Sequence, residues 1–184
     1  MKKIQFIKES LKSLKEVGTI LPSSKGIINK MVEPIDFKNN ITIIELGSGT
    51  GVITKKILNK MNSESNLICF ETNKKFYNEL KKIDDKKMTL LNDSAEMMES
   101  YLNENEIIKV DYIVSSVPLV TLPKKVTNNI LEQSEKILNN HGYLIQLQYS
   151  KLLKKRLKKH FNTIDTKFTA AYYLPAFIYT CSNK

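Results

Sequence analysis

Five apolar runs rich in β-branched residues alternate with longer segments of helical periodicity, and this alternation constrains the fold more than any other feature of the chain. Strands that alternate with helices of ten or more residues build a parallel sheet with helices on both faces. The expected strands are Ile41–Leu46, Leu67–Glu71, Met88–Asn92, Val110–Ser115 and Tyr143–Tyr149, and the expected helices are 51–61, 73–82, 94–104 and 123–139.

The end of the chain breaks this alternation. After an expected helix at 150–161, two β-rich runs, Ile164–Leu174 and Ala176–Cys181, are separated by little more than Pro175. Strands so close in sequence pair antiparallel, as a hairpin. We therefore expect one α/β domain over residues 1–184, in which residues 40–184 form a seven-stranded, mostly parallel sheet that ends in an antiparallel hairpin at its edge.

The first 33 residues have a different pattern. Ile4, Ile7, Leu11, Leu14 and Val17 recur at three- and four-residue spacings with lysines between them, which predicts a basic amphipathic helix over 3–17. After a break at Gly18–Ser24, Ser23 or Ser24 is expected to cap a second helix that runs to Met31 and is stopped by Pro34. Residues 1–33 are thus expected to form an N-terminal cap of amphipathic helices.

A glycine-rich turn, Glu45-Leu46-Gly47-Ser48-Gly49-Thr50-Gly51, joins the first expected strand to its helix. Glycines permit positive φ and let backbone amides approach a nucleotide-like ligand closely. The carboxylate of Glu45 is a poor neighbour for a pyrophosphate but suits a ligand that is cationic at this point. A dinucleotide therefore fits this turn less well than a positively charged cofactor.

Acidic residues also end the next two strands. Glu71 lies about twenty residues beyond the glycine turn, where a carboxylate bonds ribose hydroxyls. Asp93 is in a position to accept a hydrogen bond from an exocyclic amine such as that of adenine. The alternative is that both residues only stabilise the start of the following helix.

The net charge of +10 and the pI near 9.4 point to an anionic partner, either nucleic acid or an acidic membrane surface, unless they only reflect background composition. Only Arg156 among the 29 basic residues is arginine, which weakens a base-reading function. Cys69 and Cys181 have no metal-ligand spacing and are expected to be buried free thiols, and no metal is expected. No apolar stretch reaches the ~18 residues that span a bilayer. We expect a cytoplasmic protein whose membrane contact is peripheral.

The glycine turn and the strand-end acids resemble those of the class I S-adenosylmethionine-dependent methyltransferases, over nearly the whole chain. The resemblance implies a Rossmann-like sheet and S-adenosylmethionine as the cofactor. It implies that the turn cradles the cofactor, that Glu71 binds its ribose and that Asp93 faces its adenine. The cofactor-binding residues expected on this basis are Glu45, Gly47, Ser48, Gly49, Thr50, Gly51, Glu71, Thr72, Asp93, Ser94 and Ser115.

The segment after the fourth strand separates the subfamilies. Adenine-N6 methyltransferases carry Asn/Asp-Pro-Pro-Tyr/Phe there, whereas this chain has Ser115-Ser116-Val117-Pro118-Leu119, without the amide and the aromatic ring. The related rRNA adenine dimethyltransferases also carry a helical C-terminal domain that we do not find here. The short bacterial phospholipid N-methyltransferases are more similar, through 17–24, 45–52, 115–119 and Gln148-Tyr149-Ser150. Ser48 and Ser150 depart from them, where proline and glycine are common.

The resemblance implies methyl transfer to phosphatidylethanolamine or its methylated derivatives at the inner face of the cell membrane. An ornithine-type aminolipid and an RNA adenine remain alternative acceptors, with nucleic acid the less favoured partner. Tyr149, Ser115 and Ser116 are the expected catalytic residues, and the Val117 carbonyl is a further candidate to hold the headgroup. The expected substrate and membrane contacts are Lys3, Phe6, Ile7, Lys8, Leu11, Lys12, Pro22, Ser23, Ser24 and Pro118.

Overall fold

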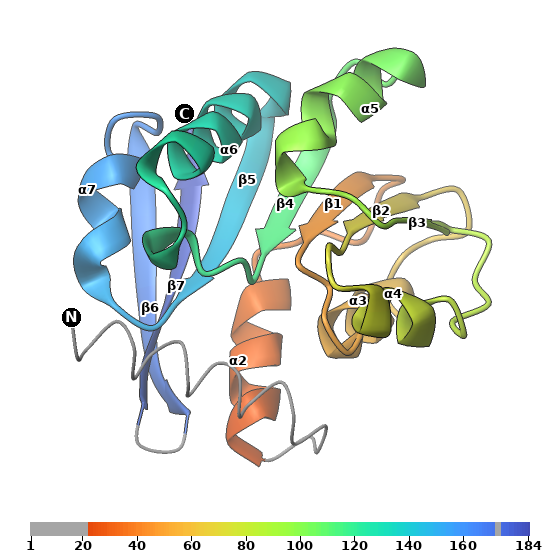
Figure 1. The fold of residues 1–184 in the computed structure, drawn as a ribbon, viewed down its shortest axis with the longest axis horizontal. Coiled ribbons are helices and arrows are strands. Elements are labelled where there is room, and N and C mark those ends of the chain that lie inside the picture. Colours follow the sequence, from red (N-terminus) through yellow and green to blue (C-terminus); the bar gives the residue numbers. More distant parts are fainter. Residues whose placement is uncertain (1–21, 172–173) are drawn as a thin grey trace.

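The computed structural model describes residues 22–171 and 174–184, which form a single seven-stranded sheet covered by helices on both faces (Figure 1). The strand order is β3-β2-β1-β4-β5-β7-β6. The first five strands in the sequence run parallel, and β7 is antiparallel to both β5 and β6. The strands are β1 (Thr42–Leu46), β2 (Asn66–Phe70), β3 (Met88–Leu91), β4 (Val110–Ser115), β5 (Leu138–Gln148), β6 (Thr163–Ala171) and β7 (Leu174–Ser182). The expected mostly parallel sheet with a terminal hairpin is confirmed.

The helices separate into two layers, and each layer has its own hydrophobic core. Side chains of α2 and α3 pack on one face of the sheet, and those of α5, α6 and α7 pack on the other. Because both faces are covered, the central strands are apolar at successive positions, as in Ile43 and Ile44, which are both fully buried. The α-helices are α2 (Pro22–Val32), α3 (Val52–Leu58), α4 (Lys74–Leu80), α5 (Met98–Glu104), α6 (Lys124–Ile137) and α7 (Lys154–Leu157), and the 3₁₀ turns are η1 (Ala95–Met97), η2 (Leu119–Thr121) and η3 (Lys151–Leu153).

Two elements differ from the expectation in ways that matter for the site. β5 begins at Leu138, five residues earlier than expected, and Gly142 makes this possible. A Cβ on Gly142 would lie 2.7 Å from the Asp111 carbonyl oxygen, so only glycine allows β5 to approach β4 here. The expected helix at 150–161 is also shorter, because it divides into η3 and the four-residue α7. Closely spaced like charges destabilise a helix, which fits an early end in this lysine-rich segment.

The expected amphipathic helix over 3–17 lies outside the described residues, and so do Lys3, Phe6, Ile7, Lys8, Leu11 and Lys12. The second expected helix is α2, which starts at Pro22. Ser23 and Ser24 therefore lie in its first turn and do not cap it, which corrects that expectation. Proline suits a first helical turn because its φ is already helical and it has no N–H to satisfy. Ile27, Met31 and Val32 of α2 are buried against the sheet.

Both cysteines are free and buried, as expected. Within residues 22–171 and 174–184, no helix combines the length and the apolar character that a membrane crossing requires. The same described residues contain no group of three His, Cys, Asp or Glu side chains arranged to hold a metal ion.

Candidate functional site

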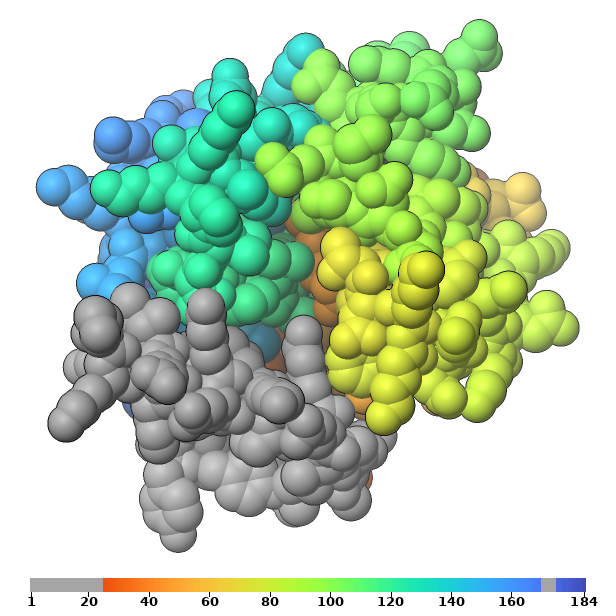
Figure 2. Space-filling model, viewed as in Figure 1, coloured from red at the N-terminus to blue at the C-terminus, as the bar shows by residue number. Residues whose placement is uncertain are grey.

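The carboxyl ends of β1, β2 and β4 lie side by side and bring the predicted site residues together. Leu46 at the end of β1 pairs with Phe70 of β2 on one side and with Ser115 of β4 on the other. In Figure 2 the molecule is hollowed between the yellow segment that includes α4 and the teal segment that follows β4, with orange atoms from the region of β1 at its floor. This edge of a parallel sheet is where α/β proteins bind their ligands.

The glycine turn adopts backbone angles that favour glycine at three positions. The φ angles of Gly47, Gly49 and Gly51 are 73°, 57° and 78°. A Cβ on Gly47 would lie 3.1 Å from the Val117 side chain, and one on Gly51 would lie 2.8 Å from the Leu80 side chain. Gly49 has open space around it apart from the Gly47 carbonyl at 3.9 Å. The turn is therefore fixed on two sides, while its middle glycine keeps room for the close approach of a ligand.

Glu71 ties the glycine turn to the end of β2. Its Oε2 accepts a hydrogen bond from the Gly49 amide at 2.8 Å, and its Oε1 accepts one from the Asn73 amide at 2.8 Å. The side chain is buried, although an ionised carboxylate has about four acceptor positions and keeps some of them for a ligand. Asn73 in turn caps α4. Glu71 thus organises two backbone segments around the predicted ribose position.

Glu45 is a buried carboxylate that is only partly satisfied. Its Oε2 accepts hydrogen bonds from Thr54 Oγ1 at 2.7 Å and from Cys69 Sγ at 3.5 Å. Its Oε1 and the neighbouring Ser48 Oγ have no hydrogen-bond partner among the described residues. Burial raises the pKa of Glu45 to about 7, against the lowering effect of its hydrogen bonds. A buried carboxylate with an unpaired oxygen and a raised pKa favours a cationic or hydrogen-bond-donating group beside it.

The other predicted cofactor residues are more exposed. Thr50, Thr72 and Asp93 lie on the surface. Asp93 Oδ1 accepts a hydrogen bond from the Ser94 amide at 2.6 Å, and Ser94 is the N-cap of η1, with its Oγ accepting from the Glu96 amide at 3.2 Å. Asp93 therefore precedes the cap of this helix as an exposed residue, and this hydrogen bond occupies only one of its carboxylate oxygens.

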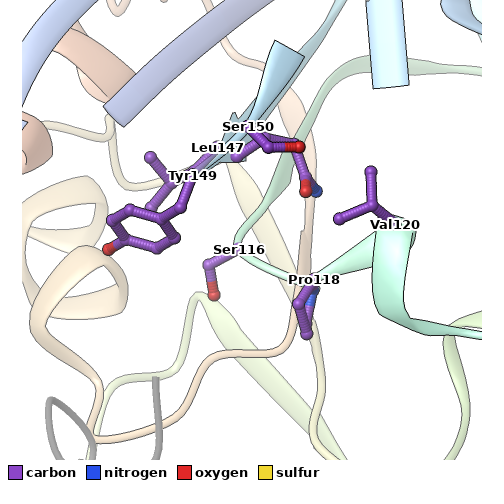
Figure 3. A pocket seen from close by; sticks show the side chains of 7 residues that line it. Ser116, Pro118, Val120, Leu147, Tyr149 and Ser150 are labelled. Carbon is purple, nitrogen blue, oxygen red and sulfur yellow. The ribbon is translucent and has the colours of Figure 1, made fainter. Parts of the chain in front are cut away.

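A second hollow lies at the ends of β4 and β5 (Figure 3). The residues that line it are Ser116, Pro118, Val120, Leu147, Gln148, Tyr149 and Ser150. The Ser116 hydroxyl donates a hydrogen bond to the Gly47 carbonyl at 2.7 Å, so this hollow is joined directly to the glycine turn. The structure thereby places Ser116, Pro118 and Tyr149, which the sequence predicted, around one opening.

Tyr149 and Ser115 have distinct surroundings. The Tyr149 ring packs against the core on the α2 side of the sheet, and its burial raises the pKa of the phenol. The phenol is therefore neutral at physiological pH, so its hydroxyl is available to donate and to accept hydrogen bonds. Ser115 is 0% exposed, and its Oγ accepts a hydrogen bond from the Val117 amide at 3.4 Å. Ser115 therefore does not line the hollow. Its buried hydroxyl instead contacts the loop that follows β4, through the Val117 amide.

Two buried glutamines hold this loop, and the sequence analysis did not assign them a role. Gln146 Nε2 and Gln148 Nε2 each donate to the Val117 carbonyl at 3.0 Å. The same carbonyl also accepts a hydrogen bond from the Leu119 amide at 2.8 Å. With three donors around an oxygen that has two lone pairs, the Val117 carbonyl is fully used and is not free for a headgroup. The detectable signal was two glutamines at alternate positions of an otherwise apolar strand, which places both amides on one buried face.

Comparisons with known proteins agree with this geometry. A family model described as "Methyltransferase small domain" matches residues 22–174. An ornithine lipid N-methyltransferase of Singulisphaera acidiphila is 22% identical over 179 residues, which cover 96% of this chain and 93% of that protein. The ribosomal RNA small subunit methyltransferase A of Hydrogenobaculum sp. is 33% identical over 114 residues, which cover 61% of this chain and 44% of that protein, so the chain spans less than half of that relative.

Among solved structures, the N-methyltransferase NodS of Bradyrhizobium japonicum in complex with S-adenosyl-L-homocysteine has the same fold. Its TM-score is 0.69 at 10% sequence identity, with 90% of each chain covered. The similarity extends over the described sheet and its helices, whereas the identity is too low to carry residue roles from one protein to the other.

Proposed function

The chain belongs to the methyltransferase small domain family, and on that premise we propose that it transfers methyl groups to the amine of a membrane lipid headgroup. Its cofactor is S-adenosylmethionine. Phosphatidylethanolamine with its methylated derivatives and ornithine-type aminolipids share the required chemistry, which is an amine nitrogen on a lipid headgroup at the membrane surface.

The residues of the glycine turn and of the ends of β1 and β2 fit this cofactor. The unpaired Oε1 of Glu45 suits the cofactor's amino group, and the remaining lone pairs of Glu71 suit its ribose hydroxyls. Gly49 leaves room for close approach at the middle of the turn. When bound, S-adenosylmethionine supplies an electrophilic methyl group on a sulfonium centre. The protein contributes by placing the acceptor beside it, since positioning supplies much of the acceleration in such a displacement.

The lining of the second hollow is the observation that carries the choice of acceptor. Among the described residues that line this hollow, Tyr149 is the only aromatic one, and the others have small, aliphatic or amide side chains. Leu119 follows Pro118, where adenine-N6 methyltransferases carry an aromatic residue. It is 0% exposed and packs in the core, so this position supplies no ring to the opening. An enzyme that methylates a base holds it by stacking between side chains and by hydrogen bonds to its edge. This hollow fits a small amine headgroup better.

Tyr149 is proposed to orient the acceptor amine. A headgroup amine titrates near a lysine and must lose a proton before its nitrogen can accept a methyl group. A neutral phenol has lone pairs that accept a hydrogen bond from the amine and thereby direct its lone pair. The Ser116 hydroxyl, which donates to the Gly47 carbonyl, also keeps lone pairs for this purpose.

The proposal places the protein at an anionic membrane surface on the cytoplasmic side, as a peripheral protein. The net charge of +10 supports this placement, because lysines near such a surface contribute about 1 kcal/mol each. The basic segment 3–17, Pro22, Ser23 and Ser24 remain predicted membrane or substrate contacts.

One labelling experiment tests the proposal. The full chain is incubated with methyl-labelled cofactor and, separately, with mixed micelles of phosphatidylethanolamine, mixed micelles of ornithine lipid, and total RNA. Label in either lipid supports the proposal, and the two lipid arms identify the acceptor. Label in RNA alone overturns it.

RNA adenine methylation is the second candidate, because the matched part of the Hydrogenobaculum rRNA methyltransferase is 33% identical. It predicts labelled N6-methyladenine in rRNA and binding whose affinity falls steeply with salt. The same labelling experiment therefore decides between the two candidates.

A further inference from the structure

The second hollow is here called the acceptor hollow. In the sequence, a basic segment with an exposed apolar side chain directly follows Ser150, the last residue that lines it. Six of the nine residues from 151 to 159 are Lys or Arg. Leu153 and Leu157 are 0% exposed and fix this segment to the sheet, whereas Leu152 is 70% exposed. The exposed cations of the segment are Lys151, Lys155, Lys158 and Lys159. The segment is therefore packed on the fold and still presents an apolar residue and several charges to solvent.

Phe168 on β6 lies beside this segment. It is 61% exposed, although it is a large aromatic residue. Its ring centroid is 5.5 Å from that of Phe177 on β7, and Lys151 Nζ lies 5.5 Å from the same Phe177 ring. Phe168 and Lys151 thus contact one shared residue, which brings β6 and η3 together on the face of the sheet covered by α6 and α7.

Phe168 and the basic segment are connected to the acceptor hollow through the strand register and the chain. Phe177 pairs in register with both Phe168 and Gln148, and Gln148 is the last residue of β5 and lines the hollow. Tyr149 and Ser150, which also line it, immediately precede Lys151 (Figure 3). A flat partner seated on this surface would therefore reach the opening of the hollow.

We propose that these residues, Lys151, Leu152, Lys155, Lys158, Lys159 and Phe168, form a docking surface for an anionic membrane, here called the η3–β6 surface. The inference rests on the proposed function, because it assigns the surface by which the site meets its lipid. Ion pairs among the described residues involve none of these lysines. Unpaired cations around two exposed apolar side chains complement a bilayer with negatively charged headgroups, where lysines meet the charges and Leu152 and Phe168 enter the acyl boundary.

An RNA partner fits the same surface less well. The surface has one exposed ring, that of Phe168, while Leu152 offers none. Arg156, the single arginine of the chain, has an Nη1 atom that is buried. Phosphate contacts alone do not require exposed apolar residues, whereas insertion into a membrane does.

The test compares variants of the full chain in co-sedimentation with vesicles. One variant is Leu152→Ser with Phe168→Ser, and the other is Lys155→Glu with Lys158→Glu. The probes are vesicles of phosphatidylcholine with and without one-third phosphatidylglycerol. We expect the wild type to bind the anionic vesicles preferentially and each double variant to bind them about tenfold or more weakly.

Matched controls lie in segments that precede β2, β3 and β4, outside the η3–β6 surface. Ile108 is 87% exposed and precedes β4, while Lys60 follows α3 and Lys86 precedes β3. Ile108→Ser and the double variant Lys60→Glu, Lys86→Glu change exposed apolarity and net charge without touching the η3–β6 surface. We expect both to bind vesicles like the wild type, and circular dichroism checks that every variant is folded.

Three outcomes overturn the inference. They are unchanged vesicle binding in the η3–β6 variants, equal losses in the controls, and a wild type that binds RNA but not anionic vesicles. Methyl transfer to lipid in detergent micelles separates this inference from the proposed function. If η3–β6 variants methylate micellar lipid normally but fail on vesicles, both ideas stand. If the wild type methylates no lipid in micelles, the proposed function fails, while vesicle binding still decides the docking surface.

Discussion

The cofactor side and the acceptor side of this molecule are built in different ways. Around the glycine turn, short segments provide backbone amides, positive φ angles and carboxylates, and Glu71 connects them through the Gly49 and Asn73 amides. The acceptor hollow instead depends on side chains from β4 and β5, where two glutamine amides hold a single carbonyl. The first arrangement uses backbone groups and carboxylates at the ends of β1 and β2, which are consecutive in the sequence, whereas the second joins β4 and β5 through side chains across the intervening α6.

The largest expected effect is on the cofactor side, at Glu71. In Glu71→Gln one of the two acceptor oxygens becomes an NH₂ group, which faces a backbone N–H of Gly49 or Asn73. We expect affinity for S-adenosylhomocysteine to fall by about 100-fold or more, because an unpaired buried donor is added and a ribose acceptor is lost. Isothermal titration calorimetry measures this. Glu79→Gln, on an exposed carboxylate of α4, is the control and keeps wild-type affinity.

The glycines of the turn differ in their surroundings. Gly51→Ala places a Cβ 2.8 Å from Leu80 at a φ of 78°, and Gly49→Ala places one in open space at a φ of 57°. Backbone strain of roughly 1 kcal/mol applies to both, and overpacking adds about 1–3 kcal/mol at Gly51 only. We expect urea unfolding to show the larger loss for Gly51→Ala. We also expect Gly49→Ala to lose cofactor affinity despite its smaller loss of stability; equal stability losses would contradict this interpretation.

Glu45 is expected to make stability and cofactor affinity depend on pH in opposite directions. Its folded pKa of about 7 lies above its ordinary value of 4.5, so between these pH values the unfolded chain has released a proton that the folded protein keeps. Stability without cofactor therefore falls by roughly 3 kcal/mol as pH rises through this window. Cofactor affinity rises over the same window, as the ionised carboxylate becomes available to a cationic group.

Glu45→Gln is the matched variant for this prediction. It should remove the part of both pH slopes that Glu45 contributes, as measured by urea unfolding and by cofactor titration between pH 5 and 8. Slopes that stay unchanged in the variant would show that another group titrates.

On the acceptor side we expect a smaller effect, confined to turnover. Tyr149→Phe removes a hydroxyl from a ring that otherwise keeps its packing. The rate of methyl transfer to lipid should fall about tenfold or more, because the variant loses a group that positions the amine or transfers its proton. Cofactor affinity should stay unchanged. Near-wild-type rates would remove Tyr149 from the mechanism.

The smallest expected effect concerns the loop that the glutamines hold. Gln148→Leu removes one of the three donors to the Val117 carbonyl and leaves the Gln146 amide and the Leu119 backbone amide in place. We expect kcat/KM for the lipid to fall by a few-fold, with no change in cofactor affinity. A loss of cofactor affinity would mean that the two sides of the molecule are coupled through Ser116 and Gly47.

The sequence allowed the sheet, its strand directions and the glycine turn to be predicted, because these depend on periodicity and on a turn whose residues are neighbours in the chain. It also located Ser116, Pro118 and Tyr149 near one opening. It did not predict the early start of β5, the short α7 or the roles of Gln146 and Gln148. These depend on the close approach of Gly142 to β4 and on the pairing of distant strands.

By itself, then, the sequence determined a mostly parallel α/β sheet with a glycine turn and with the acidic residues Glu45 and Glu71 near the ends of the first two strands. The tertiary structure decided that Glu45 is buried with one unpaired oxygen, that the Val117 carbonyl is already used, and that Leu152 and Phe168 are left exposed. The physical reason is range: backbone angles and periodicity are set by neighbours in the chain, whereas desolvation, hydrogen-bond satisfaction and surface patches depend on residues that only the folded chain brings together.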